Sequence, residues 1–139
     1  MRDDDESKEG DCPSIVLYDS QYKAVASWVM QSKSVTEGGP NQWVPKAMVK
    51  EMEEWGYGKV LLKSDGEPAV RALKKKVRIR RADEITMMEV TPRGDPKANG
   101  EAESAVREIK GVARSIKAGL EQRIKEPLPA DSTILLWIV

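Results

Sequence analysis

The chain has 139 residues, 40% of them hydrophobic and 33% charged, a balance typical of one globular domain. Its 23 lysines and arginines equal its 23 aspartates and glutamates, so the formal net charge is zero. Because histidine is absent and Cys12 is the single cysteine, the sequence excludes histidine-based catalysis, histidine-containing zinc sites and internal disulfides. The enzyme classes that remain rely mostly on carboxylates.

Charge and apolar residues are distributed unevenly along the chain. Residues 1–11 carry six acids and two bases, whereas residues 71–81 carry seven bases and no acid. We expect residues 1–13 to form a disordered acidic segment and residues 14–139 to form the folded domain, which ends in STILLWIV as if cut. No apolar run reaches the ~20 residues of a membrane span, and the N-terminus is unlike a secretory signal, so we expect a soluble intracellular protein.

Hydrophobic periodicity predicts a hairpin followed by alternating helices and strands. Strands are expected at residues 14–18, 22–30, 59–63 and 85–90, and helices at 45–55, from 67 onward, and at 101–125. Pro45 and Pro68 each lie at the first turn of a predicted helix, where proline is tolerated best. The order predicts an α/β fold with a mixed sheet flanked by helices.

Asp65 is the first of two acidic residues with a notable position. It follows the apolar strand at 59–63 and precedes Gly66, so its carboxylate is expected at the carboxyl-terminal edge of the sheet. Open α/β folds place their sites at this edge. The same position also suits an ordinary turn or cap residue, which is the commoner role.

Glu103 lies one turn into the long helix and heads a row of cations. The row consists of the residues four, seven, eleven and fourteen positions further on: Arg107, Lys110, Arg114 and Lys117. Phosphates bound along this row would bring a nucleic-acid backbone past the carboxylate. Alternatively, the charges complement the helix dipole and Glu103 pairs with the first cation. Hard divalent ions bind carboxylate oxygens without histidine, so Asp65 and Glu103 suit a metal site if further carboxylates converge on them.

The order of these motifs resembles the catalytic core of retroviral and retrotransposon integrases. Ser64-Asp65-Gly66-Glu67 follows an apolar strand, and Asn99-Gly100-Glu101-Ala102-Glu103 opens the long helix after a loop that contains proline. The second motif is closest to the copia-type form, although Ser104 stands where that form usually has arginine. The resemblance covers residues 14–125 and implies a ribonuclease-H-like fold. It also implies two aspartates and one glutamate that bind two divalent ions for DNA strand transfer.

Position by position, the resemblance assigns some of these roles and leaves one unfilled. Asp65 matches the second aspartate and Glu103 the glutamate, with 37 residues between them. DNA contacts are implied for the long helix, at Arg107 and Lys110, and the row of cations adds Arg114. The first aspartate, which the family carries in a strand upstream of the hairpin, has no counterpart here, because Asp19 matches a residue of the hairpin turn. We therefore expect an integrase core that is incomplete at both ends.

Two functions are consistent with this sequence. The first is a nucleic-acid-binding, integrase-like core whose parent uses Mg²⁺ or Mn²⁺ to join a DNA 3′ hydroxyl to a target phosphodiester. Asp65 and Glu103 would be the metal ligands, retroelement ends and target DNA the partners, and the chain alone would be inactive. The resemblance further implies a homodimer, and the nucleus as the compartment in a eukaryotic host. The second function is a non-catalytic ribonuclease-H-like remnant that binds nucleic acid or protein through residues 71–81 and the long helix.

Overall fold

The computed structural model describes residues 13–82, 84–92, 100–129, 132 and 134. Its elements are β1 (Ser14–Tyr18), β2 (Val25–Val29), α1 (Val44–Glu54), β3 (Lys59–Ser64), α2 (Pro68–Arg80), β4 (Ile85–Val90) and α3 (Gly100–Ile124). The mixed α/β architecture is therefore confirmed. The acidic segment at residues 1–12, most of the loop before α3 and the last residues of STILLWIV lie outside the described residues.

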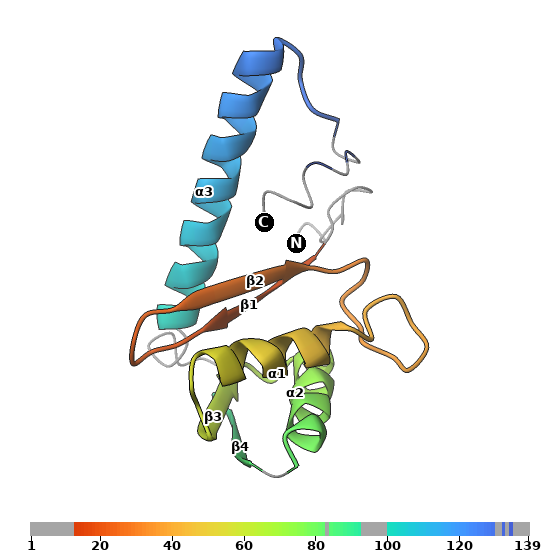
Figure 1. The fold of residues 1–139 in the computed structure, drawn as a ribbon, viewed down its shortest axis with the longest axis vertical. Helices are drawn as coiled ribbons and strands as arrows, with labels where there is room; N and C mark the ends of the chain where they lie inside the picture. Colours follow the sequence, from red (N-terminus) through yellow and green to blue (C-terminus); the bar gives the residue numbers. More distant parts are fainter. Residues whose placement is uncertain (1–12, 83, 93–99, 130–131, 133, 135–139) are drawn as a thin grey trace, which may run out of the picture.

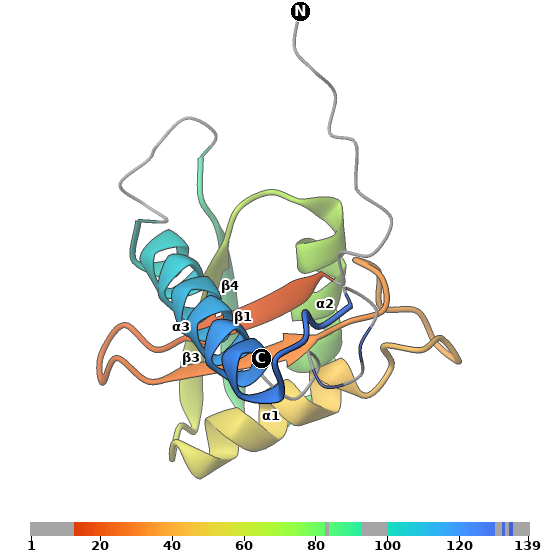
Figure 2. The same ribbon diagram turned by 90° about the horizontal axis from the view of Figure 1, so that it is seen from above.

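The four described strands form two small sheets instead of one. β1 and β2 make an antiparallel hairpin, and β3 and β4 make a parallel pair (Figure 1). The hairpin lies between α3 on one side and α1 and α2 on the other, as Figure 2 also shows. Both antiparallel and parallel pairing occur as the element order predicted, but a groove separates the hairpin from the parallel pair.

The hairpin turn is longer than the sequence indicated. The N–H of Asp19 donates to the carbonyl of Ala24, and the N–H of Lys23 donates to the carbonyl of Asp19, both at 2.8 Å. Lys23 has a φ of 61°, in the left-handed region, which interrupts an extended chain. β2 therefore begins at Val25, and Tyr22 lies in the turn with 70% of its surface exposed.

One hydrophobic core joins the hairpin, the parallel pair and the first two helices. In α1 the predicted stripe is confirmed, since Met48 and Met52 are buried, and in α2 Leu73 and Val77 point inward as predicted. The buried members of the core are Met30, Val35, Val44, Met48, Met52, Leu62, Leu73 and Val77. Apolar spacing of three and four residues is thus sufficient to find the inner faces of α1 and α2.

Helix α3 contacts the rest of the molecule mainly at its start. It packs against β1 and then extends away from the other elements (Figure 1). Ala105 is its one buried residue, whereas Ile116 and Ile124 are 47% and 45% exposed. After the helix the chain turns back, and the N–H of Leu128 donates to Glu121 Oε1 at 2.8 Å. In the described ranges no helix has the length and apolarity needed to cross a membrane.

Candidate functional site

Asp65 follows directly after the last residue of β3 and its side chain is exposed. Its Oδ1 accepts a hydrogen bond from the N–H of Glu67 at 3.2 Å, so it acts as a turn residue before α2. The carbonyl of Ser64 accepts from the N–H of Thr91 at 2.9 Å and from its hydroxyl at 3.1 Å. These bonds fix the end of β3 against the end of β4 and so position the Asp65 backbone.

A buried lysine lies beneath this edge of the parallel pair. Lys74 is 5% exposed, and its Nζ donates to the carbonyl of Glu89 at 2.7 Å and to that of Leu62 at 3.4 Å. Burial, and then the nearby charge of Arg71, lowers the pKa of Lys74, while the carboxylates of Asp65 and Glu89 oppose the shift.

Glu103 is exposed in the first turn of α3. It forms no ion pair with Arg107 among the described contacts, so the alternative of a Glu103–Arg107 pair receives no support. Its neighbour Glu101 pairs with Lys23 in the hairpin turn at 3.1 Å. That hydrogen bond, followed by the contact with Tyr18, raises the pKa of Lys23. The Lys23–Glu101 pair attaches the start of α3 to the hairpin.

Asp65 and Glu103 share no hydrogen-bond or ion-pair partner among the described residues. The Asp65 side chain has one hydrogen-bond partner, the N–H of Glu67, and the Glu103 side chain has none in the described part of the chain. No group of three or more His, Cys, Asp or Glu side chains that could hold a metal ion occurs among the described residues. Two exposed carboxylates do not by themselves supply enough oxygen ligands for a two-metal site.

The cations of α3 form an accessible ridge, defined here as Arg107, Lys110 and Arg114. All three side chains are exposed, and none has an ion-pair partner among the residues described. The fourth cation of the row, Lys117, pairs instead with Glu121 at 3.6 Å. A polyanion could therefore bind the ridge without breaking an ion pair among the described residues.

The basic run at residues 71–81 is less available than its sequence indicated. Lys74 and Arg81 are 5% and 3% exposed, respectively, and both donate to backbone carbonyls. These two side chains are therefore not accessible to a phosphate, so any nucleic-acid contact of the run depends on its exposed cations. The exposed cations of the run are Arg71, Lys75, Arg78 and Arg80.

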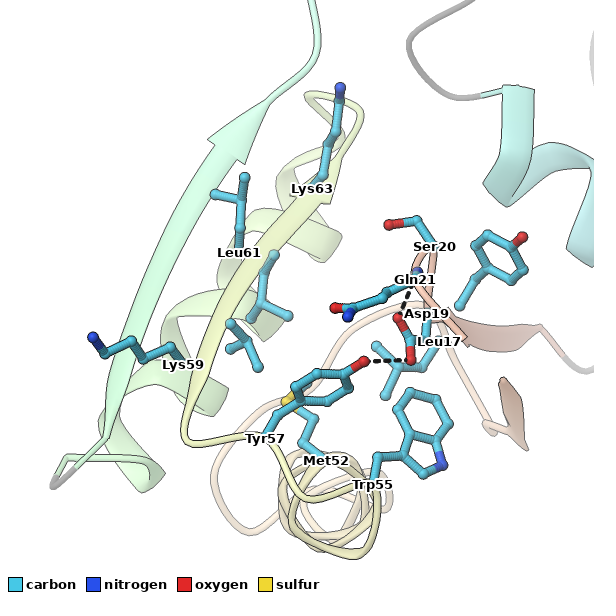
Figure 3. Close-up of a pocket in the computed structure, with 13 residues that line it drawn as sticks. Leu17, Asp19, Ser20, Gln21, Met52, Trp55, Tyr57, Lys59, Leu61 and Lys63 are labelled. Atoms are coloured by element: carbon cyan, nitrogen blue, oxygen red, sulfur yellow. Dashed lines mark hydrogen bonds between the residues drawn. The ribbon is translucent and has the colours of Figure 1, made fainter. Parts of the chain in front are cut away.

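A polar contact that the sequence did not indicate joins the hairpin turn to the connection between α1 and β3. The hydroxyl of Tyr57 donates to Asp19 Oδ2 at 2.8 Å, and the N–H of Gln21 donates to Asp19 Oδ1 at 2.9 Å (Figure 3). Burial alone would raise the pKa of Asp19, but the hydrogen bonds from Tyr57 and from backbone N–H groups outweigh it and lower that pKa. Burial, and then the bond to Asp19, raises the pKa of Tyr57 to about 12.

The Asp19–Tyr57 contact lies at the wall of a cavity of about 300 Å³. The end of β1, the end of α1 and the length of β3 surround this cavity (Figure 3). Asp19 and Tyr57 are 38 positions apart, and each lies in a polar turn, so no local pattern could have paired them. Comparison with protein families, with curated proteins and with solved structures gives no match.

Proposed function

We propose that this chain is an integrase-like, nucleic-acid-binding core that binds duplex DNA through the ridge on α3. The observation that carries the proposal is the ridge itself, since Arg107, Lys110 and Arg114 are exposed and lack acidic partners among the described residues. Three cations spaced by three and four residues lie along one side of a helix, where they can follow a phosphate backbone.

The order of elements further supports an integrase-like core of the ribonuclease-H-like class. An antiparallel hairpin, a helix and a parallel pair with its intervening helix precede the long helix. Asp65 at the end of β3 and Glu103 in the first turn of α3 occupy the two positions that the family motif assigns to metal ligands.

The same observations argue that the chain alone does not catalyse strand transfer. Asp65 and Glu103 are two carboxylates, and the described residues supply no third one to complete a site for Mg²⁺ or Mn²⁺. We therefore assign to this chain the DNA-binding part of the parent activity, with metal binding dependent on a further carboxylate. DNA is the partner, and a homodimer remains a prediction.

The DNA-binding proposal is tested with matched sets of substitutions. Binding of a fluorescent 20-base-pair duplex is followed by anisotropy between 50 and 200 mM salt, conditions in which phosphate contacts dominate affinity. Each phosphate contact contributes about 0.9 to the salt slope, so replacing the three ridge cations with glutamine should lower the slope by about 3. The control replaces three exposed cations of α2, Lys75, Arg78 and Arg80, with glutamine.

The comparison between the two sets separates the alternatives. A larger effect of the α3 set supports the proposal, whereas a larger effect of the α2 set assigns binding to the other basic run. If the unmodified chain binds no duplex at any salt concentration, the proposal fails.

The prediction that this chain does not catalyse strand transfer is tested separately. Strand transfer with Mn²⁺ should give no product with this chain. Turnover that disappears in Asp65→Asn would refute this and would mean that another acid completes the site. Calorimetric titration with Mg²⁺ should likewise show no site that is lost in Asp65→Asn or Glu103→Gln.

A further inference from the structure

We propose that the free edge of β3 binds an extended peptide strand of a partner protein, in which two acidic side chains flank an apolar one. In the part of the chain that the structure describes, β3 pairs with β4 only, so its other edge has no strand partner. That other edge borders the cavity of about 300 Å³ (Figure 3). The inference concerns a peptide and does not rest on the proposed binding of DNA.

The lining of the cavity shows that it follows the edge of β3 and not one of its faces. Side chains alternate between the two faces of a strand, so a cavity against one face is lined by every second residue. Here five consecutive residues, 59–63, all border the cavity. The cavity therefore runs along the side of the strand on which its backbone N–H and C=O groups are available, and such an edge is a template for strand addition.

The opposite wall combines apolar and polar residues and is fixed in place. It is formed by residues 17–21, at the end of β1 and in the hairpin turn, together with Met52 and Trp55 of the α1 end. Leu17 packs against the hydrophobic core, and Met52 is part of it. The 2.8 Å bond from Tyr57 to Asp19 holds the hairpin turn against the α1–β3 connection. An incoming strand would thus find apolar contacts for the side chains that point inward.

The exposed face of β3 determines which side chains the incoming strand should carry on its outward-facing side. Lys59, Leu61 and Lys63 lie on this face, and Leu61 is 52% exposed. On the β4 side, Lys63 pairs with Glu89 at 3.6 Å, but the register partner of Lys59 is the apolar Ile85. Opposite charges on neighbouring strands stabilise their pairing. A strand added at the free edge is therefore favoured if, at alternate positions, it places an acidic residue beside Lys59, an apolar residue beside Leu61 and an acidic residue beside Lys63.

The acidic segment of the chain itself is a poor occupant. Residues 1–12, MRDDDESKEGDC, supply acids but lack the alternating apolar residues that the inner wall requires. A separate polypeptide with both features fits the groove better. We therefore assign the site to a partner strand of acidic and apolar alternation.

The backbone part of the proposal is tested with a synthetic probe. The probe is a fluorescein-labelled peptide with the core Asp-Val-Val-Leu-Glu, and its binding to the full chain is followed by anisotropy. Two further peptides carry N-methyl groups on every second backbone nitrogen, one peptide on the odd positions and the other on the even positions. Each peptide therefore lacks the hydrogen-bond donors along one of its two edges. We expect saturable binding of the parent and a loss of about tenfold for the set that faces β3, because each lost hydrogen bond weakens binding several-fold.

Equal binding of all three peptides would overturn the proposal, and so would no binding of the parent peptide. Hydrogen exchange gives a second readout, since the amides of residues 59–64 should become more protected when the parent peptide binds. If protection increases only elsewhere in the chain, the peptide binds at another site and the proposal fails.

The charge part is tested with two variants of identical net charge. Lys59→Glu should weaken binding of the acidic peptide about fivefold and should strengthen binding of a Lys-Val-Val-Leu-Lys peptide. Lys46→Glu is the control, because Lys46 is exposed on α1 and does not border the cavity. Equal effects of the two substitutions would show that general electrostatics and not the β3 edge governs binding, which would refute the assignment.

Discussion

Replacing Arg81 with methionine should destabilise the fold strongly, although Arg81 belongs to a run of apparently solvated bases. Its guanidinium Nε donates to Thr86 Oγ1 at 3.1 Å, and Nη2 donates to the carbonyls of Tyr57 at 3.0 Å and Gly58 at 3.4 Å. Nη2 also lies 2.6 Å from Glu84 Oε2. One side chain therefore holds the end of α2 against β4 and against the chain that leads into β3.

The expected loss of stability follows from the polar groups that Arg81→Met leaves without a hydrogen-bond partner. Hydrogen bonds from a charged donor contribute about 1.5–3 kcal/mol each, and breaking a buried ion pair costs about 3–5 kcal/mol. Two features lower the sum. The Glu84 side chain is 36% exposed as a whole, so its carboxylate can turn toward water although Oε2 is buried, and Arg81 Nη1 is already buried without a hydrogen-bond partner. We expect Arg81→Met to lower the free energy of unfolding by about 3 kcal/mol, which corresponds to a Tm lower by about 10 °C for a chain of this size.

The assay is urea unfolding followed by tryptophan fluorescence, with Arg80→Met as the matched control. Arg80 is adjacent and exposed, so its replacement should change the free energy of unfolding by no more than about 0.5 kcal/mol. In the DNA titration, Arg81→Met should leave the salt slope unchanged, because none of the Arg81 side chain is exposed. A cost below about 1 kcal/mol, or equal costs for the two variants, would refute the structural role of Arg81.

Three further substitutions test the turns and the core. Tyr57→Phe should abolish a late phenol titration seen by ultraviolet absorbance, because the Tyr57 pKa is raised to about 12. The stabilisation that accompanies this shift is complete below pH ~10 and is lost as pH rises through about 12. A late titration that persists in the variant would contradict this assignment. Met52→Ala, at a residue that is 2% exposed, should cost about 3 kcal/mol in urea unfolding, and a cost below about 1 kcal/mol would mean that the site collapses. Gly56→Ala should cost about 1 kcal/mol because Gly56 has a φ of 82°, whereas Gly58→Ala, with equally open space and no positive φ, should be neutral.

Local patterns predicted the elements well because they depend on near neighbours in the sequence. The spacing of Met48 and Met52 and that of Leu73 and Val77 defined the inner faces of α1 and α2. The error in the hairpin arose where an apolar, β-branched run continued into a turn. At Lys23 the left-handed backbone, stabilised by hydrogen bonds across the turn, prevailed over the strand propensity of the run.

Tertiary contacts account for what the sequence could not predict about the cations. Within the run at 71–81, Lys74 and Arg81 lie four residues after Val70 and Val77 and so toward the inner side of α2, but helix spacing does not show that a charged side chain finds partners there. Lys74 is identified only by its bond to the carbonyl of Glu89, and Arg81 only by its bonds to distant residues such as Tyr57. A buried cation requires such partners, and these belong to other elements of the fold.

The relation between the two acidic residues is likewise decided by how α3 docks on the hairpin. Glu103 lies in the first turns of α3, close to the buried Ala105 and to the exposed Lys23–Glu101 pair, which itself stabilises the docking little. Arg114 lies eleven residues further on, about 16 Å along the axis, where the helix is exposed. Under the proposed function, affinity for DNA would depend on the outer part of α3, whereas the docked start of the helix determines how far Glu103 lies from Asp65. Substitutions that loosen the docking should therefore change the position of Glu103 relative to Asp65 and leave DNA binding through the ridge intact.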